Sequence, residues 1–576
     1  MNIIIPTLFF FSAILAIANR KTGYFALVIT SIFMAAVAVF SFNILHLFWL
    51  ITSVSWAMIS IYSISYDRYG RWLSPLFAIM LAGMSLVLTS GNYLIFLSGW
   101  EIMSISAYFI LGIHREKSFP SFIFMAFSEL STIFILLGFA LAYSQTGSIA
   151  FTRLTSTLPL DLTVIGFLLK MGAFPFLLVE WLPIAHSSAP ANVSAALSAT
   201  MPLMGVYGII KMSMLSPIDP DLGLLLISVG AFTAFFGALY SHASDHYKML
   251  PAYSSVESYG SILLLLGVSL FAPNNTIALF SIIGVALFSL AHSFAKSGIF
   301  MISGLIKSEY MSSSTGISSR QVDVGRLLLA SSLSGLLPNI GGVATWMLLE
   351  IMFISAFVEK NSLFGLLFLF VGTIMAMTEG LITAVMIKFI AFSGVFSSSE
   401  KKGNFSIFIM GLIVLFSGMI SSIIVNALDS IFTSSAPNLF TYFIIISLKE
   451  SGSTFGGISP LYVGLLIGLF TLVTYFAFGK NKLRRVPVWN NGEVIQEKYA
   501  PSAFSNNLKL ILKLLYRPNE YTYARNIFWD SLVKFTLTCK RIAKYISYYV
   551  MNSQINIYII YLIITFLFII IYISRF

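Results

Sequence analysis

Four ionisable residues stand inside long apolar stretches of the chain, where a charge is costly. They are Glu101, Lys170, Lys296 and Lys388. Inside a lipid bilayer a charged side chain costs at least roughly 2.5–3.5 kcal/mol, so each one needs a partner, a water-filled cavity or a function. One such lysine is readily explained as a structural ion pair, but four embedded charges favour the handling of protons or ions.

The neighbours of two of these lysines are suited to proton transfer. Lys170 precedes Gly172 and Pro175, and a proline frees helix carbonyls, which membrane proteins tolerate where the backbone lines a cavity. Desolvation favours a neutral amine and a nearby carboxylate favours an ammonium, so Lys170 is a candidate proton switch. His292 lies four residues before Lys296, and the two share a helix face as a candidate proton relay.

Four further acidic residues lie nearer the ends of apolar stretches. For these, solvation at the membrane surface is as good an explanation as function. They are Glu129, Glu180, Glu350 and Glu379.

The composition excludes several classes of protein. Of 576 residues, 58% are hydrophobic and 10% are charged, which is far too apolar for a soluble globular protein. The single cysteine, Cys539, excludes an internal disulfide and a multi-cysteine zinc or iron–sulfur site bound by this chain alone. We find no P-loop, dinucleotide-binding glycine turn or His-Glu-x-x-His motif. We therefore expect a transporter, with no cofactor on this chain and any redox cofactor on a partner.

Apolar stretches of about 20 residues recur along the whole chain, and each is long enough for a membrane helix. We expect an all-α polytopic membrane protein with about 15–17 spans. The first stretch has no charged leader, so a cleaved signal peptide is not expected. Basic residues in alternate short loops, with Arg153 as an exception, predict an external N terminus; they are Arg20, Lys21, Arg68, Arg71, Arg115, Lys117 and Lys248.

The largest polar interval, 480–550, holds thirteen Lys or Arg against four Asp or Glu. Its mixed apolar and cationic residues predict an amphipathic helix at the membrane surface. We interpret it as a lateral helix across a neighbouring subunit, anchored by a terminal helix. A basic loop resting on lipid is the alternative. Nucleic-acid binding is not expected, because anionic lipid already explains the basic residues.

Several motifs resemble those of one family. Residues 181–195, WLPIAHSSAPANVSA, are similar to the signature of the antiporter-like membrane subunits of respiratory complex I, energy-converting hydrogenases and multisubunit cation/proton antiporters. Gly99-Trp100-Glu101, the run DHYKMLPAYSSVE at 245–257, His292 with Lys296, and Lys388 accompany it. The AYSSVE run, Ser198 and the tail at 500–504 and 515–518 resemble the hydrogenase-4 and formate-hydrogenlyase component B branch.

This resemblance implies two inverted five-helix repeats, each with a broken helix. We divide the chain accordingly into N-terminal flanking helices (1–69), a first half-channel repeat (70–245), a second half-channel repeat (246–400), additional spans (401–479), the basic lateral segment (480–550) and a terminal anchoring helix (551–576). One departure concerns the second break, where residues 337–342 lead to Thr345-Trp346 and the branch has a glutamate before a tryptophan.

The resemblance also implies roles for individual residues in proton translocation. Glu101 would set the charge state of Lys170, and Lys170 would store a proton. Lys248 and His292 would pass it on, and Lys296 and Lys388 would store and release it.

The implied partners are the bilayer of the cell (plasma) membrane and other membrane and peripheral subunits of a complex I-like NADH dehydrogenase or a hydrogenase. Those subunits would carry iron–sulfur clusters, with Ni-Fe or flavin, so this chain would be a translocating subunit without a redox centre. The transported ion is H⁺, with Na⁺ as an alternative. A cation/proton antiporter that acts alone and a scaffold that does not pump are the other hypotheses, and the embedded charges argue against the scaffold.

Overall fold

The structure is a computed structural model that describes residues 3–67, 69–113, 118–173, 181–313, 317–395, 404–432, 445–450, 453–478, 501–504, 516–518 and 524–550. The chain forms two compact units, residues 1–511 and residues 512–576.

The first unit is built almost entirely of helices, which confirms the predicted all-α class. The helices are α1 (Ile4–Ala18), α2 (Arg20–Phe40), α3 (Ile44–Tyr66), α4 (Leu73–Thr89), α5 (Tyr93–Leu111), α6 (Ser118–Thr146), α7 (Leu158–Met171), α8 (Trp181–Ser188), α9 (Ala191–Ala199), α10 (Leu203–Ser213), α11 (Pro220–Ala243), α12 (Met249–Phe271), α13 (Asn275–Leu305), α14 (Arg320–Leu333), α15 (Ile340–Val358), α16 (Ser362–Ile390), α17 (Phe405–Met419), α18 (Ser421–Phe432) and α20 (Pro460–Phe478).

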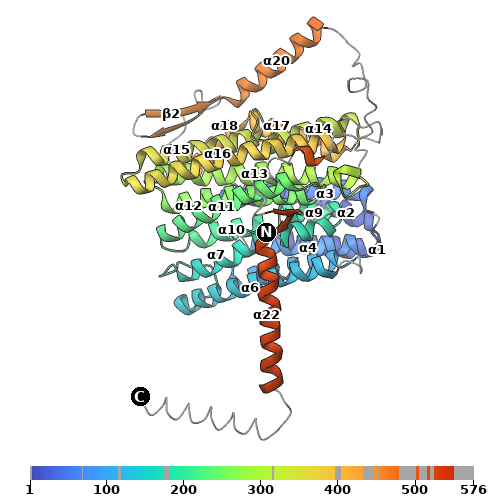
Figure 1. Ribbon diagram of the computed structural model, residues 1–576, viewed down its shortest axis with the longest axis vertical. Coiled ribbons are helices and arrows are strands. Elements are labelled where there is room, and N and C mark those ends of the chain that lie inside the picture. Colours follow the sequence, from blue (N-terminus) through green and yellow to red (C-terminus); the bar gives the residue numbers. More distant parts are fainter. Residues whose placement is uncertain are drawn as a thin grey trace. The chain divides into compact units, whose positions relative to one another are not determined.

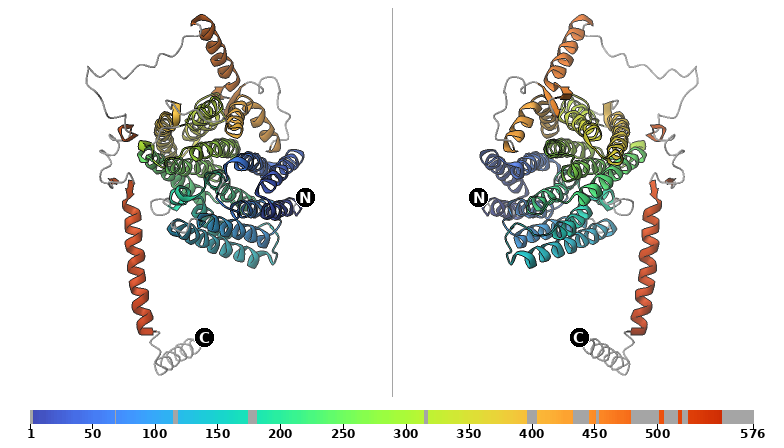
Figure 2. Two further views of the ribbon diagram at one scale, coloured as in Figure 1. Left: turned by 90° about the vertical axis from the view of Figure 1, so that its right-hand side faces the viewer. Right: turned by 90° about the vertical axis from the view of Figure 1, so that its left-hand side faces the viewer.

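Apart from α20, which projects from the others, these helices lie side by side, in an order that runs from cyan through green to yellow (Figure 1). In the views of Figure 2 most of them are seen nearly end on, so their axes are roughly parallel. Short elements complete the unit: η1 (Met311–Ser313), η2 (Ala391–Val395), η3 (Pro501–Phe504), and β1 (Ile446–Glu450) paired antiparallel with β2 (Ser453–Ile458).

The described residues contain 11 helices long and apolar enough to cross a membrane, or 12 if the bent pair α17–α18 is one span. This number is below the expected 15–17 because four apolar stretches form helices of 14 to 17 residues: α1, α4, α7 and α14. The stretch near 436–448 lies mostly outside the described residues and ends in β1. The expected terminal span also lies outside them.

The helical path is interrupted at two places, after α7 and between α14 and α15. The first break follows α7, where Gly172 adopts a left-handed conformation with φ 66° and its N–H bonds Leu168 and Leu169 carbonyls. A helix break after Lys170 was predicted, although Pro175 itself lies outside the described residues. The second break separates α14 from α15 and contains Gly335 with φ 65°. The two inverted repeats themselves remain a prediction.

Glycines allow α11 and α12 to pack backbone to backbone. Gly223, Gly230 and Gly237 recur every seven residues on α11, and Gly267 and Gly260 face the first two of them from α12. A Cβ atom at Gly230 would lie 2.6 Å from the backbone N of Leu264. Small residues of this kind drive close helix packing in membranes, and here they fix the position of the polar residues on α12.

The second unit contains β3 (Tyr516–Pro518), paired antiparallel with β4 (Ala524–Asn526), and the helix α22 (Ile527–Val550). Residues 534–545 of α22 are exposed within their unit. A helix of mixed apolar and cationic residues therefore occupies the end of the basic interval 480–550. Its proposed lateral position, like the other segment boundaries, remains a prediction, and residues 551–576 lie outside the described residues.

Replacing Gly230 with leucine is expected to separate α11 from α12 and to lower the melting temperature of the detergent-solubilised protein by several degrees. The control is Gly468→Leu in α20, where a Cβ atom would meet nothing within 4 Å. Thermal-shift measurements on both variants test this packing, and equal melting temperatures would contradict it.

Candidate functional site

Lys170 is buried at the end of α7, with 1% of its surface exposed. Its Nζ donates hydrogen bonds to Ser104 Oγ of α5 at 2.7 Å and to Ser128 Oγ of α6 at 2.9 Å. The ammonium also faces the rings of Phe124 and Trp100, with 4.8 and 5.8 Å to their centroids. A cation is favoured here because the C-terminal end of a helix is negative.

Two half-buried carboxylates act electrostatically on Lys170. They are Glu101 of α5, which was predicted, and Glu129 of α6, for which function and solvation were equally expected. Glu101 accepts a hydrogen bond from Thr132 Oγ1. Lys170 and Glu101 therefore lie close enough to interact, as the resemblance implied.

A second cluster surrounds Lys296 of α13, whose side chain is fully buried. Its Nζ donates to Ser254 Oγ at 2.6 Å and to the Pro251 carbonyl at 3.0 Å, both on α12. The carboxylate that acts on it is Glu257, which accepts hydrogen bonds from Ser258 and Ser261 at 3.0 and 3.2 Å.

Glu257 was missed as a site residue although it stands in the quoted AYSSVE run. It is an acid inside an apolar stretch, and this signal, which singled out Lys296, applies to it equally.

His292 lies one turn before Lys296, as predicted, and is 1% exposed. Its Nε2 is 3.2 Å from the Ser198 carbonyl of α9. A carbonyl only accepts, so we assign the N–H to Nε2. The hydroxyl of Tyr259 donates to the same carbonyl at 2.8 Å, and Ser198 Oγ is 2.6 Å from Ser255 Oγ. The short helix α9 thus links α12 and α13 at the polar centre.

His186 lies between the two lysine clusters. A cavity of about 10 Å³ touches both Lys170 and His186, and a space of this size accommodates about one water molecule. His186 is buried, its ring stacks on Phe300 at 4.8 Å, and the charges of Lys248 and Lys296 act on it. His186 stood in the quoted signature but was assigned no role.

The remaining two predicted residues, Lys248 and Lys388, donate hydrogen bonds to backbone carbonyls, and Lys388 also pairs with a carboxylate. Lys248 is half-buried and its Nζ donates to the Ala189 carbonyl, just after α8, at 2.7 Å. Lys388 is fully buried and its Nζ lies 2.5 Å from Asp245 Oδ1 and 2.9 Å from the Ser244 carbonyl. Lys388 therefore has a buried ion-pair partner that sequence reasoning did not assign.

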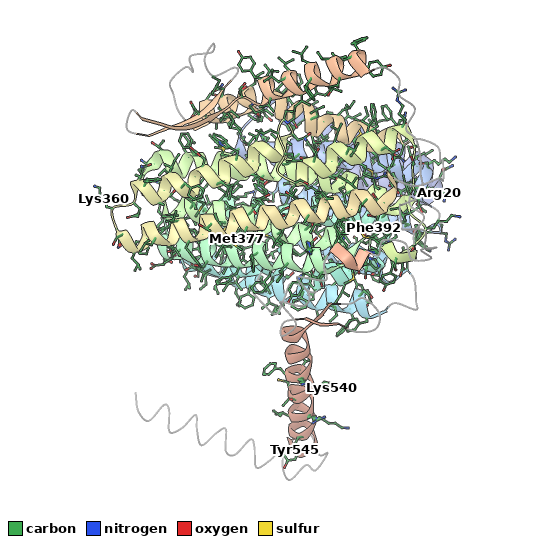
Figure 3. The ribbon with its side chains drawn as sticks, turned by 45° about the horizontal axis from the view of Figure 1, so that its top comes forward. Arg20, Lys360, Met377, Phe392, Lys540 and Tyr545 are labelled. Carbon is green, nitrogen blue, oxygen red and sulfur yellow. The ribbon has the colours of Figure 1, made fainter. Side chains whose placement is uncertain are left out.

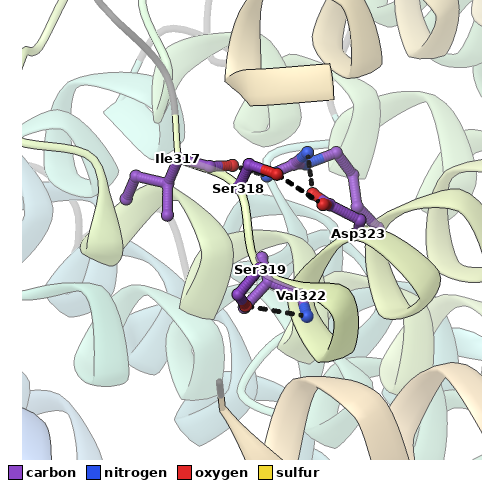
Figure 4. A network of polar contacts seen from close by, with 6 residues as sticks. Ile317, Ser318, Ser319, Val322 and Asp323 are labelled. Atoms are coloured by element: carbon purple, nitrogen blue, oxygen red, sulfur yellow. Dashed lines mark hydrogen bonds and ion pairs between the residues drawn. The ribbon is translucent and has the colours of Figure 1, made fainter. Parts of the chain in front are cut away.

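A polar network surrounds Asp323 at the start of α14 (Figure 4). Buried Arg326 of α14 donates to Asp323 Oδ1 at 2.7 Å and to the Ile317 carbonyl at 2.5 Å, and Ser318 also donates to Asp323. The Ile317 N–H in turn donates to the Ser393 carbonyl at 2.9 Å, in η2. The start of α14 and the end of α16 are thereby held together.

The other three acids considered from sequence differ in their burial or lie outside the described residues. Glu379 of α16 is buried, whereas Glu350 of α15 is only half-buried. Glu180 lies outside the described residues.

Comparison with known proteins identifies the part of the chain that carries these clusters. Residues 90–323 match the family described as "NADH:quinone oxidoreductase/Mrp antiporter, TM". The chain is similar to this family over that segment, which is less than half of its length.

Curated relatives match about half of this chain. An uncharacterized protein of Mycobacterium tuberculosis is 34% identical over 276 residues, which are 45% of this chain and 43% of that protein. Hydrogenase-4 component B of Escherichia coli (strain K12) is 30% identical over 280 residues, 45% of this chain and 41% of that protein. The matches thus span less than half the length of these two relatives.

Two solved structures share the fold. A chain of the membrane-bound sulfane sulfur reductase, an archaeal respiratory membrane complex, has a TM-score of 0.81 at 18% identity, covering 98% of this chain and 99% of that one. A chain of the Mrp complex from Dietzia sp. DQ12-45-1b has a TM-score of 0.62 at 15% identity, covering 76% of this chain and 98% of that one. The fold shared with these two chains therefore extends well beyond residues 90–323.

The buried ion pair between Lys388 and Asp245 predicts a compensating double variant. Lys388→Met removes the buried ammonium that compensates the charge of Asp245 and is expected to lower stability by about 3–5 kcal/mol. Asp245→Asn in the same chain removes that uncompensated charge and is expected to restore most of the loss. Unfolding measured in mild detergent for the two single variants and the double variant tests this, and additive losses would contradict it.

Proposed function

We propose that the chain translocates protons across a membrane as a subunit of a redox-driven complex. The observation that carries this proposal is the set of three fully buried lysines, each under the influence of a carboxylate. Lys170 has Glu101 and Glu129, Lys296 has Glu257, and Lys388 has Asp245. Such an arrangement allows each lysine to gain or lose a proton when a neighbouring charge changes.

The first step depends on the interaction of Glu101 with Lys170. When Glu101 is ionised it favours the charged ammonium, and when it is neutralised the cost of desolvation favours release of the proton. The serine hydroxyls that accept from the ammonium can also donate to a neutral amine. Lys170 therefore keeps hydrogen-bond partners in both states.

A released proton has a short polar route toward the second cluster. One water in the cavity beside Lys170 would reach His186. From there Lys248, His292 and Lys296 are the next titratable groups, with α9 between them. Lys296 would then store the proton against Glu257, and Lys388 would release it at the far end of α16. The coupling between these groups is electrostatic. A charge that moves by a few ångströms in a low dielectric strongly changes the proton affinity of the neighbouring titratable groups.

The source of energy is proposed to lie on other subunits. The single cysteine argues against an iron–sulfur cluster held by this chain alone. Likeness to hydrogenase-4 component B and to a respiratory reductase chain supports membrane and peripheral partners that carry iron–sulfur clusters, with Ni-Fe or flavin. The proposed location is the plasma membrane.

A cation/proton antiporter is the second candidate function. The fold shared with an Mrp complex chain, at a TM-score of 0.62, favours it. It would use the same buried lysines to exchange H⁺ against a cation such as Na⁺, without redox partners.

Lys170→Ala is expected to reduce proton translocation by proteoliposomes at least tenfold, while the protein still inserts and folds. Lys170→Arg should also be poor, because arginine does not release its proton. The rate is measured as dye-reported acidification of the vesicles, for the complex as purified.

The control for that experiment is Lys211→Met. Lys211 of α10 is mostly buried, but its Nζ binds Ser90 at the end of α4, outside the proposed route. This variant should keep most of the rate per folded protein. Normal translocation by Lys170→Ala would contradict the proposed function and favour a scaffold.

Purification tests the proposed partners. The tagged chain, extracted in mild detergent, is expected to bring down iron–sulfur subunits that mass spectrometry and metal analysis identify. Nickel together with iron would indicate a hydrogenase, and iron without nickel a complex I-like or modified reductase. Recovery without any metal would contradict the redox-driven proposal and favour the antiporter.

A further inference from the structure

A second small cavity lies beside the Lys296 cluster, among α12, α13, α14, α15 and α16. Its volume is about 20 Å³, and three ionisable residues line it: Glu257, His292 and Glu379. A space of this size holds one water molecule when two to four polar groups surround it. Hydroxyl groups complete the polar lining, from Ser258, Ser332 and Thr345.

Two atoms of these residues lack a hydrogen-bond partner in the described part of the chain. They are His292 Nδ1 and Glu379 Oε1. Both side chains are buried, with exposed fractions of 1% and 9%. Buried polar atoms are normally satisfied, and ordered water is their usual partner when protein groups are missing. Glu257 has no such need, because Ser258 and Ser261 donate to its oxygens.

The chemistry of the two unpartnered atoms is complementary. Because Nε2 of His292 donates to the Ser198 carbonyl, its Nδ1 is an acceptor that requires a donor. A water in the cavity supplies that donor, and its oxygen accepts in turn from the Glu379 carboxyl if that carboxyl is protonated. Of the two acids at this cavity, Glu257 interacts with Lys296, and no ion pair involves Glu379 among the residues described. Glu379 is buried near the charge of Glu257, and both burial and a neighbouring like charge favour the protonated form of a carboxyl.

Glu379 also lies deep along its helix. Figure 3 draws α16 between Lys360 and Phe392, with Met377 midway along it, and Glu379 follows two residues later. It is therefore remote from both ends of α16 and from the ion pair of Lys388.

We propose that this cavity holds one water molecule that joins Glu379 to His292, and that Glu379 stores a proton for the relay. This rests on the proposed translocation of protons. In the transfer, the O–H bond of the Glu379 carboxyl breaks as the water accepts its proton. An O–H bond of that water breaks as His292 Nδ1 takes a proton, which regenerates the water. The products are a carboxylate and an imidazolium, so total charge is conserved.

Infrared spectroscopy of the purified full chain, with its native subunits, tests the stored proton directly. Films at neutral pH are compared in H₂O and D₂O, because the C=O stretch of a protonated carboxyl shifts on deuteration. We expect such a band in the wild type, its loss in Glu379→Gln and its retention in Glu350→Gln. Glu350 is the matched control, a half-buried acid of α15 outside this cavity. A band unchanged in Glu379→Gln would overturn the proposal.

Exchange into H₂¹⁸O tests the water. An isotope-sensitive O–H band present in the wild type should be absent from Glu379→Gln, and identical spectra would contradict the bridge. If Glu379→Gln does not fold, Glu379→Asp is used instead, because it should keep the carboxyl band at a changed frequency. An unchanged frequency would overturn the proposal.

The two proposals are separated by measuring translocation on the same samples. Glu379→Gln is expected to slow translocation about tenfold or more, as for loss of a positioned proton donor. Loss of the infrared band in a complex whose wild type moves no protons would support this site and contradict the proposed function. Normal translocation with an unaffected band would leave the function standing and overturn this site.

Discussion

The cost of holding a charge away from water is the constraint on which this structure depends. Lys170, Lys296 and Lys388 are all buried within the helical body, where each ammonium must be compensated by hydrogen bonds and by a carboxylate. The chain meets this requirement with serines, backbone carbonyls and acids from neighbouring helices. Because part of the compensation comes from carboxylates, which themselves gain or lose protons, the same interactions that make burial tolerable also make each lysine responsive to its surroundings.

Much of the helical framework serves to bring these groups together. The left-handed Gly172 ends α7 directly after Lys170, so a lysine lies at the negative end of a helix inside the body. Glycines on α11 and α12 allow the backbone of Gly237 and Glu257 to approach closely, which holds α12 and its acid in place. Arg326 braces the turn that follows Lys388 through the carbonyl of Ile317. The packing of the helices therefore determines which charged side chains lie close enough to interact.

Sequence reasoning predicted the helical class and the buried charges well, because a lysine within an apolar stretch is visible without a structure. The pairing of His292 with Lys296 followed from helical spacing alone. Interaction partners on different helices were harder to predict. The pairing of Asp245 with Lys388 and the position of His186 depend on how distant segments pack, and hydrophobic periodicity does not encode that packing. Glu379 was weighed equally between function and solvation because it lies nearer the end of an apolar stretch, and Glu257 was quoted in a motif without a role. Fewer helices of spanning length than expected are found in the described residues, because several apolar stretches form helices of 14 to 17 residues and the expected terminal span lies outside those residues.

The central claim is that both lysine clusters act in one proton route, and non-additivity tests it most directly. Translocation rates are measured for Lys170→Ala, Lys296→Ala and the double variant, each corrected for folded protein. If the clusters act in series, the double variant should be no slower than the slower single variant. Losses that multiply in the double variant, or single variants that retain normal rates, would contradict the account.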